Sequence, residues 1–177
     1  MFNTVSIKDE ICLKASTQVL VLGVGNILLS DEGIGVRVVE ELQKLSLPEN
    51  IELFDGGTSS LDILLAEAKL KKLIVVDALR TTREPGTIYK GSFTAEQLDQ
   101  LEEVFDKASK FSLHQIGLID ALIAARTLGC APEETVIIGI EPLEISCGLE
   151  ISDKLKAQLP KIINIVLKEI ENAVHEK

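Results

Sequence analysis

Short apolar runs alternate along the chain with longer segments in which apolar residues recur every three or four positions. Four of the runs are almost continuously apolar, as in strands that are buried on both faces of a parallel sheet. They are Gln18–Gly23, Ile51–Phe54, Leu73–Val76 and Val136–Ile140. A fifth run, Gly86–Phe93, is more polar and follows Pro85. It predicts a strand at the edge of the sheet.

The segments between these runs carry the apolar stripe of helices that pack on a core. These stripes cover residues 34–45, 61–68, 116–128 and 155–170, and residues 94–108 have a weaker helical pattern. Pro160 lies inside the last stripe, so we expect a kink or a new helix start there. The alternation predicts an α/β three-layer sandwich, with a mostly parallel, twisted sheet of about five strands between helices. We expect a single domain over residues 18–177, with residues 1–17 as an N-terminal extension.

Composition and charge narrow the classes of partner. Of the 177 residues, 46% are hydrophobic, and 28 acidic against 18 basic residues give a formal charge of −10. Such a surface repels nucleic acid and anionic membranes. The three cysteines have no paired spacing, which argues against a disulfide framework and favours the cytoplasm. No apolar run approaches the roughly 18 residues of a membrane helix, and the charged N-terminal residues do not form a signal peptide.

Ligands of a parallel sheet bind beyond the carboxyl ends of its strands, which directs attention to the strand-to-helix turns. The first strand leads into a glycine-rich loop between Gly23 and Gly35. The loop does not match the dinucleotide fingerprint, because Leu28 occupies the third glycine position. Asp31 and Glu32 would also repel a phosphate. Either acid could instead stabilise the positive end of the following helix.

Two more turns offer side chains that could bind a metal ion. Asp77 ends the third apolar run, where it either caps a turn or contributes to a site. Ser112 and Gln115 match a helix capping box, which places His114 in the first helical turn. The positive helix end disfavours imidazolium, so His114 tends to remain a neutral ligand. Glu32, Asp77 and His114 would meet at one edge, where two carboxylates and one imidazole suit a divalent ion.

Two other carboxylates have both a structural and a functional interpretation. Asp55 directly follows the second apolar run and could be a turn residue before a helix. It could also orient or deprotonate a water molecule. Glu141 and Pro142 follow the last strand, where they either shape a substrate groove or simply end the strand.

From Gln18 to the last helix, the chain resembles the maturation endopeptidases of nickel–iron hydrogenases. The resemblance rests on VLVLGVGNILLSDEGIGVRVVEEL, FDGGTSS, LIVVDAL, SLHQIGL, VIIGIEP and CGLEIS, in this order. It implies an aspartyl-type peptidase that removes a C-terminal extension from the large-subunit precursor after nickel insertion. It also implies that Glu32, Asp77 and His114 contact nickel that belongs to the substrate, and that Asp55 and Asp77 are catalytic. Glu150 departs from the Ser or Thr of many relatives, which concerns only the cap of the last helix.

Two alternatives remain open from the sequence. The glycine-rich loop would also suit a nucleotide-binding α/β module. A non-catalytic assembly factor would bind the precursor and release it uncut.

Overall fold

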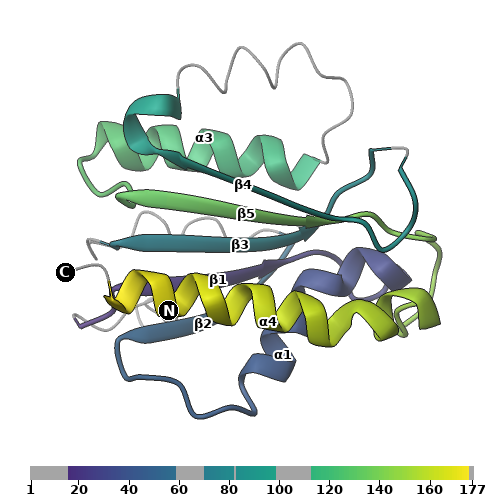
Figure 1. Ribbon diagram of the computed structural model, residues 1–177. Helices are drawn as coiled ribbons and strands as arrows, with labels where there is room; N and C mark the ends of the chain where they lie inside the picture. Colours follow the sequence, from purple (N-terminus) through teal and green to yellow (C-terminus); the bar gives the residue numbers. More distant parts are fainter. Residues whose placement is uncertain (1–15, 59–69, 82, 99–112, 176–177) are drawn as a thin grey trace, which may run out of the picture.

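The computed structural model describes residues 16–58, 70–81, 83–98 and 113–175, and of residues 113–116 and 175 only the backbone. The sheet has five strands in the order β2-β1-β3-β5-β4 (Figure 1). They are β1 (Val19–Val24), β2 (Ile51–Gly57), β3 (Lys72–Ala78), β4 (Ile88–Thr94) and β5 (Glu134–Ile140). All neighbouring pairs are parallel except β4 with β5. The predicted strands and the edge position of Gly86–Phe93 are therefore confirmed.

The strand ends differ from the predicted runs by up to three residues, and β3 includes Asp77; the largest difference is at the end of β2. β2 does not end at Phe54 but continues to Gly57, because it pairs with β1 past a bulge between Gly23 and Val24. The N–H of Gly25 also donates to the carbonyl oxygen of Gly57 at 2.9 Å. Asp55 consequently lies within β2 and not directly after it.

Helices cover both faces of the sheet, as predicted. They are α1 (Ile34–Leu42), α3 (Leu113–Thr127) and α4 (Asp153–His175), with short 3-10 segments η2 (Ser30–Gly33) and η4 (Ala95–Gln97). α4 passes through Pro160 as one helix, so the alternative of a new helix start is wrong. The predicted stripe 61–68 and residues 99–108 lie outside the described residues. Within the described part, no helix combines the length and apolar character needed to cross a membrane.

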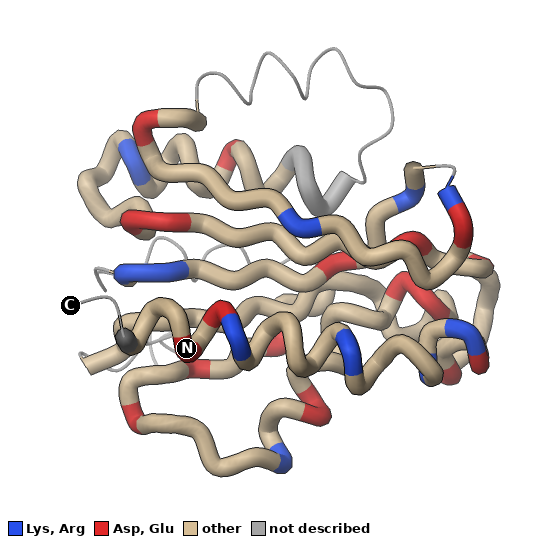
Figure 2. Tube along the Cα trace, in the orientation of Figure 1, with Lys and Arg blue, Asp and Glu red and all other residues tan. Residues whose placement is uncertain are grey.

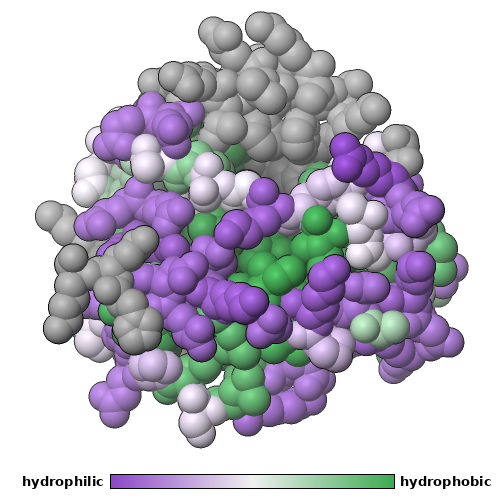
Figure 3. Space-filling view, in the orientation of Figure 1, coloured by the Kyte–Doolittle hydropathy of each residue, from purple (hydrophilic) through white to green (hydrophobic). Residues whose placement is uncertain are grey.

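Charged residues occur mainly in the helices, in the loops and near the strand ends, whereas the strand interiors are largely uncharged (Figure 2). Hydrophilic side chains accordingly dominate the face of the molecule that carries α4 (Figure 3). One lysine is an exception. Lys72 is only 4% exposed, and its Nζ lies 2.8 Å from Glu134 and 3.5 Å from Glu169. Glu169, also buried, forms a second ion pair with Lys90.

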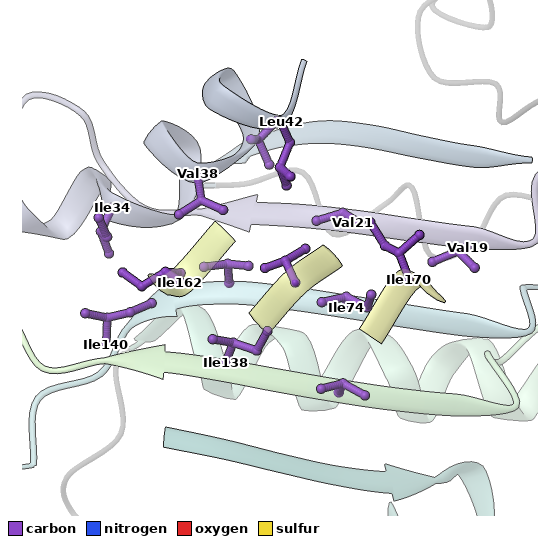
Figure 4. Close-up of a cluster of buried hydrophobic side chains, with 14 of the residues drawn as sticks. Val19, Val21, Ile34, Val38, Leu42, Ile74, Ile138, Ile140, Ile162 and Ile170 are labelled. Carbon is purple, nitrogen blue, oxygen red and sulfur yellow. The ribbon is translucent and has the colours of Figure 1, made fainter. Parts of the chain in front are cut away.

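Alternate residues of each strand divide the core into two parts. α1 and α4 pack on one face through Ile34, Val38, Leu42, Ile162 and Ile170, against strand residues such as Val21, Ile74 and Ile138 (Figure 4). α3 packs on the other face, where Leu118 and Leu122 lie in one cluster with Leu73 and Val75 of β3. The sheet is thus buried on both sides, which explains why its strands are continuously apolar.

Candidate functional site

The loop between β1 and α1 folds back closely on itself. Gly25 has φ +136°, and a Cβ atom there would lie 1.9 Å from the carbonyl oxygen of Glu32. A Cβ on Gly33 would similarly lie 2.9 Å from Cα of Ile27. Only glycine permits this conformation and such close backbone contact at Gly25. The loop therefore holds η2 directly over the carboxyl end of β1.

A second close contact brings Glu32 and Asp77 to the same edge of the sheet. A Cβ on Gly35 would lie 2.2 Å from the carbonyl oxygen of Val76 and 2.3 Å from that of Val24. The start of α1 is thus packed on the carboxyl ends of β1 and β3. Glu32 precedes Gly35 by three residues, and Asp77 follows Val76. Both lie at what we call the rim, the carboxyl ends of the parallel strands, beside the crevice where ligands of such sheets bind.

Asp31 has a structural role. Its side chain is fully buried. Oδ2 accepts hydrogen bonds from the N–H groups of Leu143 and Glu144, at 2.9 and 3.3 Å, and from the hydroxyl of Ser152 at 2.9 Å. Oδ1 accepts the N–H of Ser152 at 2.6 Å. Asp31 therefore fastens the segment after β5 to the first loop. Ser152 in turn caps α4 by accepting the N–H of Leu155, so the exposed Glu150 is not needed as the cap.

Glu32 differs sharply from its neighbour Asp31. Its Oε2 is buried, yet it accepts no hydrogen bond from any described residue. A buried carboxylate oxygen without a donor carries an uncompensated desolvation cost. A cation bound at the rim would provide the missing interaction, so the carboxylate of Glu32 fits a metal-contacting role.

Asp77 and the start of α3 share one face of the sheet. Asp77 is 2% exposed and lies opposite Gly139 of β5. Strand alternation places it on the same face as Leu73 and Val75, which pack against α3. The connection from α3 to β5 lies near Leu70, at the amino end of β3, because Leu70 accepts a hydrogen bond from Glu133. The first turn of α3 must then lie toward the rim.

His114 lies in the first described turn of α3, which is described from Leu113 onward. Its side chain and Ser112 of the expected capping box lie outside the described residues. Among the side chains that the structure does describe, no three His, Cys, Asp or Glu form a group able to hold a metal ion. The trio of Glu32, Asp77 and His114 therefore stays a prediction.

Asp55 lies at the rim on the other side of β1, opposite Gly23 in the β1–β2 register. Its exposed side chain accepts the N–H of Gly57 at 2.9 Å, a local turn interaction that agrees with the structural interpretation. It also borders a cavity of about 200 Å³, together with Gly25, Asn26 and Thr58. The position leaves one carboxylate oxygen of Asp55 available for a water molecule, so both interpretations stand.

Glu141 is structural. It is buried, and it accepts hydrogen bonds from the N–H of Thr81 at 2.9 Å and from the hydroxyl of Tyr89 at 3.0 Å. These bonds fasten the segment after β3 to β4. Of the two interpretations of Glu141, the structure favours the residue that ends the strand, and its buried carboxylate adds an internal support for the neighbouring loops.

The sequence reasoning missed a group of exposed apolar side chains at the rim. Leu28 is 59% exposed, Leu143 55% and Leu149 60%. Leu28 lies beside the segment after β5, because its carbonyl oxygen accepts the N–H of Gly148 and Leu29 pairs with Gly148. In the sequence, these exposed side chains could have been suspected from the leucines within the turn-rich segments NILLS and CGLEI. They give the rim an apolar surface suited to contact with another protein.

Residues 36–169 match the hydrogenase maturation protease family. The chain belongs to this family. It is 34% identical to the hydrogenase 2 maturation protease of Escherichia coli over 158 residues, which are 88% of this chain and 92% of that protein. It is 40% identical over 131 residues to the hydrogenase expression/formation protein HupD of Bradyrhizobium diazoefficiens, covering 72% of this chain but only 64% of that protein.

Solved structures of this protease family share the fold. The hydrogenase maturating endopeptidase HybD from Escherichia coli superposes with a TM-score of 0.77 and 33% identity, covering 89% of this chain and 94% of that one. The [NiFe] hydrogenase maturation protease HybD from Thermococcus kodakarensis gives a TM-score of 0.67 and 28% identity, covering 86% and 98%. The peptidase class and the α/β fold expected from the sequence are therefore those of the family, and a nucleotide-binding module is disfavoured.

Proposed function

We propose that this protease removes a C-terminal extension from the nickel-loaded precursor of a nickel–iron hydrogenase large subunit. In this proposal Glu32, Asp77 and His114 contact the nickel ion that the precursor carries. The buried oxygen of Glu32, which no described residue bonds, is the observation that supports it most directly. The position of Asp77 and of the first turn of α3 at the same rim agrees with it.

The donor set suits the proposed contact. Two carboxylates and one imidazole match a borderline divalent ion such as nickel, and they leave coordination positions for the ligands of the substrate. Because the ion arrives with the precursor, an unloaded precursor would leave the buried Oε2 of Glu32 uncompensated. Contact with nickel would then select the loaded precursor for cleavage.

Cleavage itself requires a water molecule to attack the carbonyl carbon of the scissile peptide bond. Asp55 is the first candidate to orient or deprotonate this water, because it is exposed at the rim beside a cavity. Asp77 is the second candidate, since a carboxylate close to the reacting groups could perform the same task. The leaving amine takes up a proton as the peptide bond breaks.

The precursor would dock on the apolar side chains of the rim, including Leu28, Leu143 and Leu149. The formal charge of −10 disfavours nucleic acid and anionic membranes as partners. We also expect the protease to work in the cytoplasm, where a precursor would receive its nickel before folding is completed.

Mass spectrometry of a candidate precursor, incubated with the protease with and without prior nickel loading, tests the proposal. Loss of a C-terminal peptide from the loaded form alone is expected. Glu32→Gln should abolish this mass decrease, whereas Glu150→Gln, which changes an exposed carboxylate, should preserve it. A stable complex with loaded precursor but no mass change would instead support the assembly-factor alternative.

A further inference from the structure

One face of α4 carries lysines at a regular interval. Lys154, Lys161 and Lys168 follow one another at intervals of seven residues, so they recur after two helical turns and point to the same side. Successive lysines are about 10.5 Å apart along the helix axis. All three are exposed. Gln158 and Ile165 lie between them on the same face.

This face of α4 forms one wall of a groove of about 600 Å³. The opposite wall comes from β4 and the turn before it, including Glu84, Ile88 and Lys90. In the space-filling view, apolar side chains are visible between the strands and α4, with hydrophilic side chains on either side (Figure 3). We call this feature the lysine groove. It offers a chain apolar contacts from Pro85, Ile88 and Ile165 among charged and polar side chains.

The charge of the lysine groove is opposite to that of the whole protein. Four lysines and two glutamates line it, on a chain with a formal charge of −10. One of the glutamates, Glu169, is already paired with Lys72 and Lys90. Basic residues recur along α4 (Figure 2). Of the four lysines of α4, Lys156 pairs with Glu150 and Asp153, whereas Lys154, Lys161 and Lys168 form no ion pair with a described residue. Their charges remain available to a partner.

The lysine groove begins beside the rim. Ile88 of β4 pairs with Ile140, the last residue of β5, and the N–H of Gly86 donates to the carbonyl oxygen of Glu141 at 2.8 Å. A Cβ on Gly86 would lie 3.2 Å from Gln158, so this turn closely approaches the first part of α4. From there the groove follows α4 away from the rim. A substrate held at the rim could therefore extend into it.

We propose that the lysine groove binds an acidic, extended segment of the precursor protein, a proposal that rests on the proposed function. Lys154 and Lys168 are fourteen residues apart, which corresponds to about 21 Å along the helix. An extended chain covers this length with about six residues. Because alternate side chains of an extended chain point the same way, acidic residues two or four positions apart would face the lysines. Because the protein as a whole carries a formal charge of −10, the lysine groove is a favourable path for an acidic segment that leaves the rim.

Charge reversal on the groove, compared with an equal charge reversal elsewhere, tests the proposal. The test variant is Lys161→Glu with Lys168→Glu. The control is Lys44→Glu with Lys156→Glu. Neither control lysine lines the groove; Lys44 pairs with Glu41, and Lys156 pairs with Glu150 and Asp153. Steady-state cleavage of nickel-loaded precursor is measured at low and high salt. The test variant should raise KM roughly tenfold at low salt with little change in kcat, and the effect should shrink at high salt.

Equal KM values for the test and control variants, or a loss confined to kcat, would overturn docking in the groove while leaving the proposed cleavage intact. If the unaltered protease cleaves no loaded precursor, the proposed function fails. The groove is then judged by the Kd for the same precursor from fluorescence anisotropy, where equal values for both variants refute it. If the test variant does not keep the thermal stability of the control, Lys161→Gln with Lys168→Gln replaces it in both assays.

Discussion

Replacing the two neighbouring acids of the first loop separates a structural carboxylate from a functional one. In Asp31→Asn, an amide nitrogen takes the place of one carboxylate oxygen. If it replaces Oδ2, the N–H groups of Leu143 and Glu144 lose their acceptor. Each lost bond to a charged, buried acceptor costs about 1–3 kcal/mol, so the free energy of unfolding should fall by about 2–6 kcal/mol. At about 2–4 °C per kcal/mol for a chain of this size, Tm should fall by about 4–24 °C.

Glu32→Gln should behave in the opposite way. Its buried Oε2 accepts no hydrogen bond from a described residue, so the neutral amide removes a desolvation cost and breaks no described bond. The free energy of unfolding should change by less than about 0.5 kcal/mol. If Glu32 contacts the nickel of the precursor, cleavage should fall roughly 100-fold or more, because even indirect supports of a metal site contribute that much.

Urea unfolding followed by far-UV circular dichroism measures both variants, with the slope m compared to confirm that the same transition is observed. Cleavage of loaded precursor is measured on the same preparations. A loss of stability below about 1 kcal/mol in Asp31→Asn would show that its carboxylate does not hold the two loops together. A larger loss in Glu32→Gln than in Asp31→Asn would reverse the assignment of the two roles.

Three further substitutions test other parts of the structure. Lys72→Met removes the buried cation from its two carboxylate partners, so the free energy of unfolding should fall by about 2–3 kcal/mol in urea titrations. The control Lys44→Met breaks an exposed ion pair and should change the same quantity by less than about 1 kcal/mol. Gly25→Ala should lower Tm by about 5 °C or more, because the φ of Gly25 is positive and the new Cβ would overlap a carbonyl oxygen. Gly91→Ala is the control and should leave Tm unchanged, because no atom lies within 4 Å of its new Cβ. Leu149→Asp should raise KM for the precursor without lowering Tm, and an unchanged KM would exclude this leucine from docking.

The strands and helices were predictable because their apolar patterns are dictated by burial. Buried β1 and β3 have no exposed side, and the stripe of α1 matches the side that packs on them. The end of β2 was not predictable, because it depends on a bulge and on the bond from Gly25 to Gly57, which join segments distant in sequence. The order of apolar and polar residues within one segment does not show which distant segment that segment pairs with.

The site was predictable only in outline, for a related reason. Strand order brings Glu32 and Asp77 to one rim, and this followed from assuming a parallel sheet. The division of labour between Asp31 and Glu32 did not follow, because the donors to Asp31 come from a segment more than 110 residues away. From the sequence alone, Asp31 and Glu32 cannot be distinguished, because their difference depends on which distant N–H groups reach each carboxylate.

The loops of the rim are held in place by two carboxylates, those of Asp31 and Glu141, whose oxygens all accept hydrogen bonds. This support allows the neighbouring carboxylate of Glu32 to remain incompletely bonded. Asp31 fastens the first loop to the segment after β5, and Glu141 fastens the segment after β3 to β4. Both supports are independent of any bound ion. Glu32 can therefore remain incompletely bonded without unfolding the loop that carries it, because Gly25 and Asp31 hold that loop in place. A rigid carboxylate with an unmet requirement distinguishes a substrate that brings a cation from one that does not, which is the discrimination that the proposed maturation step needs.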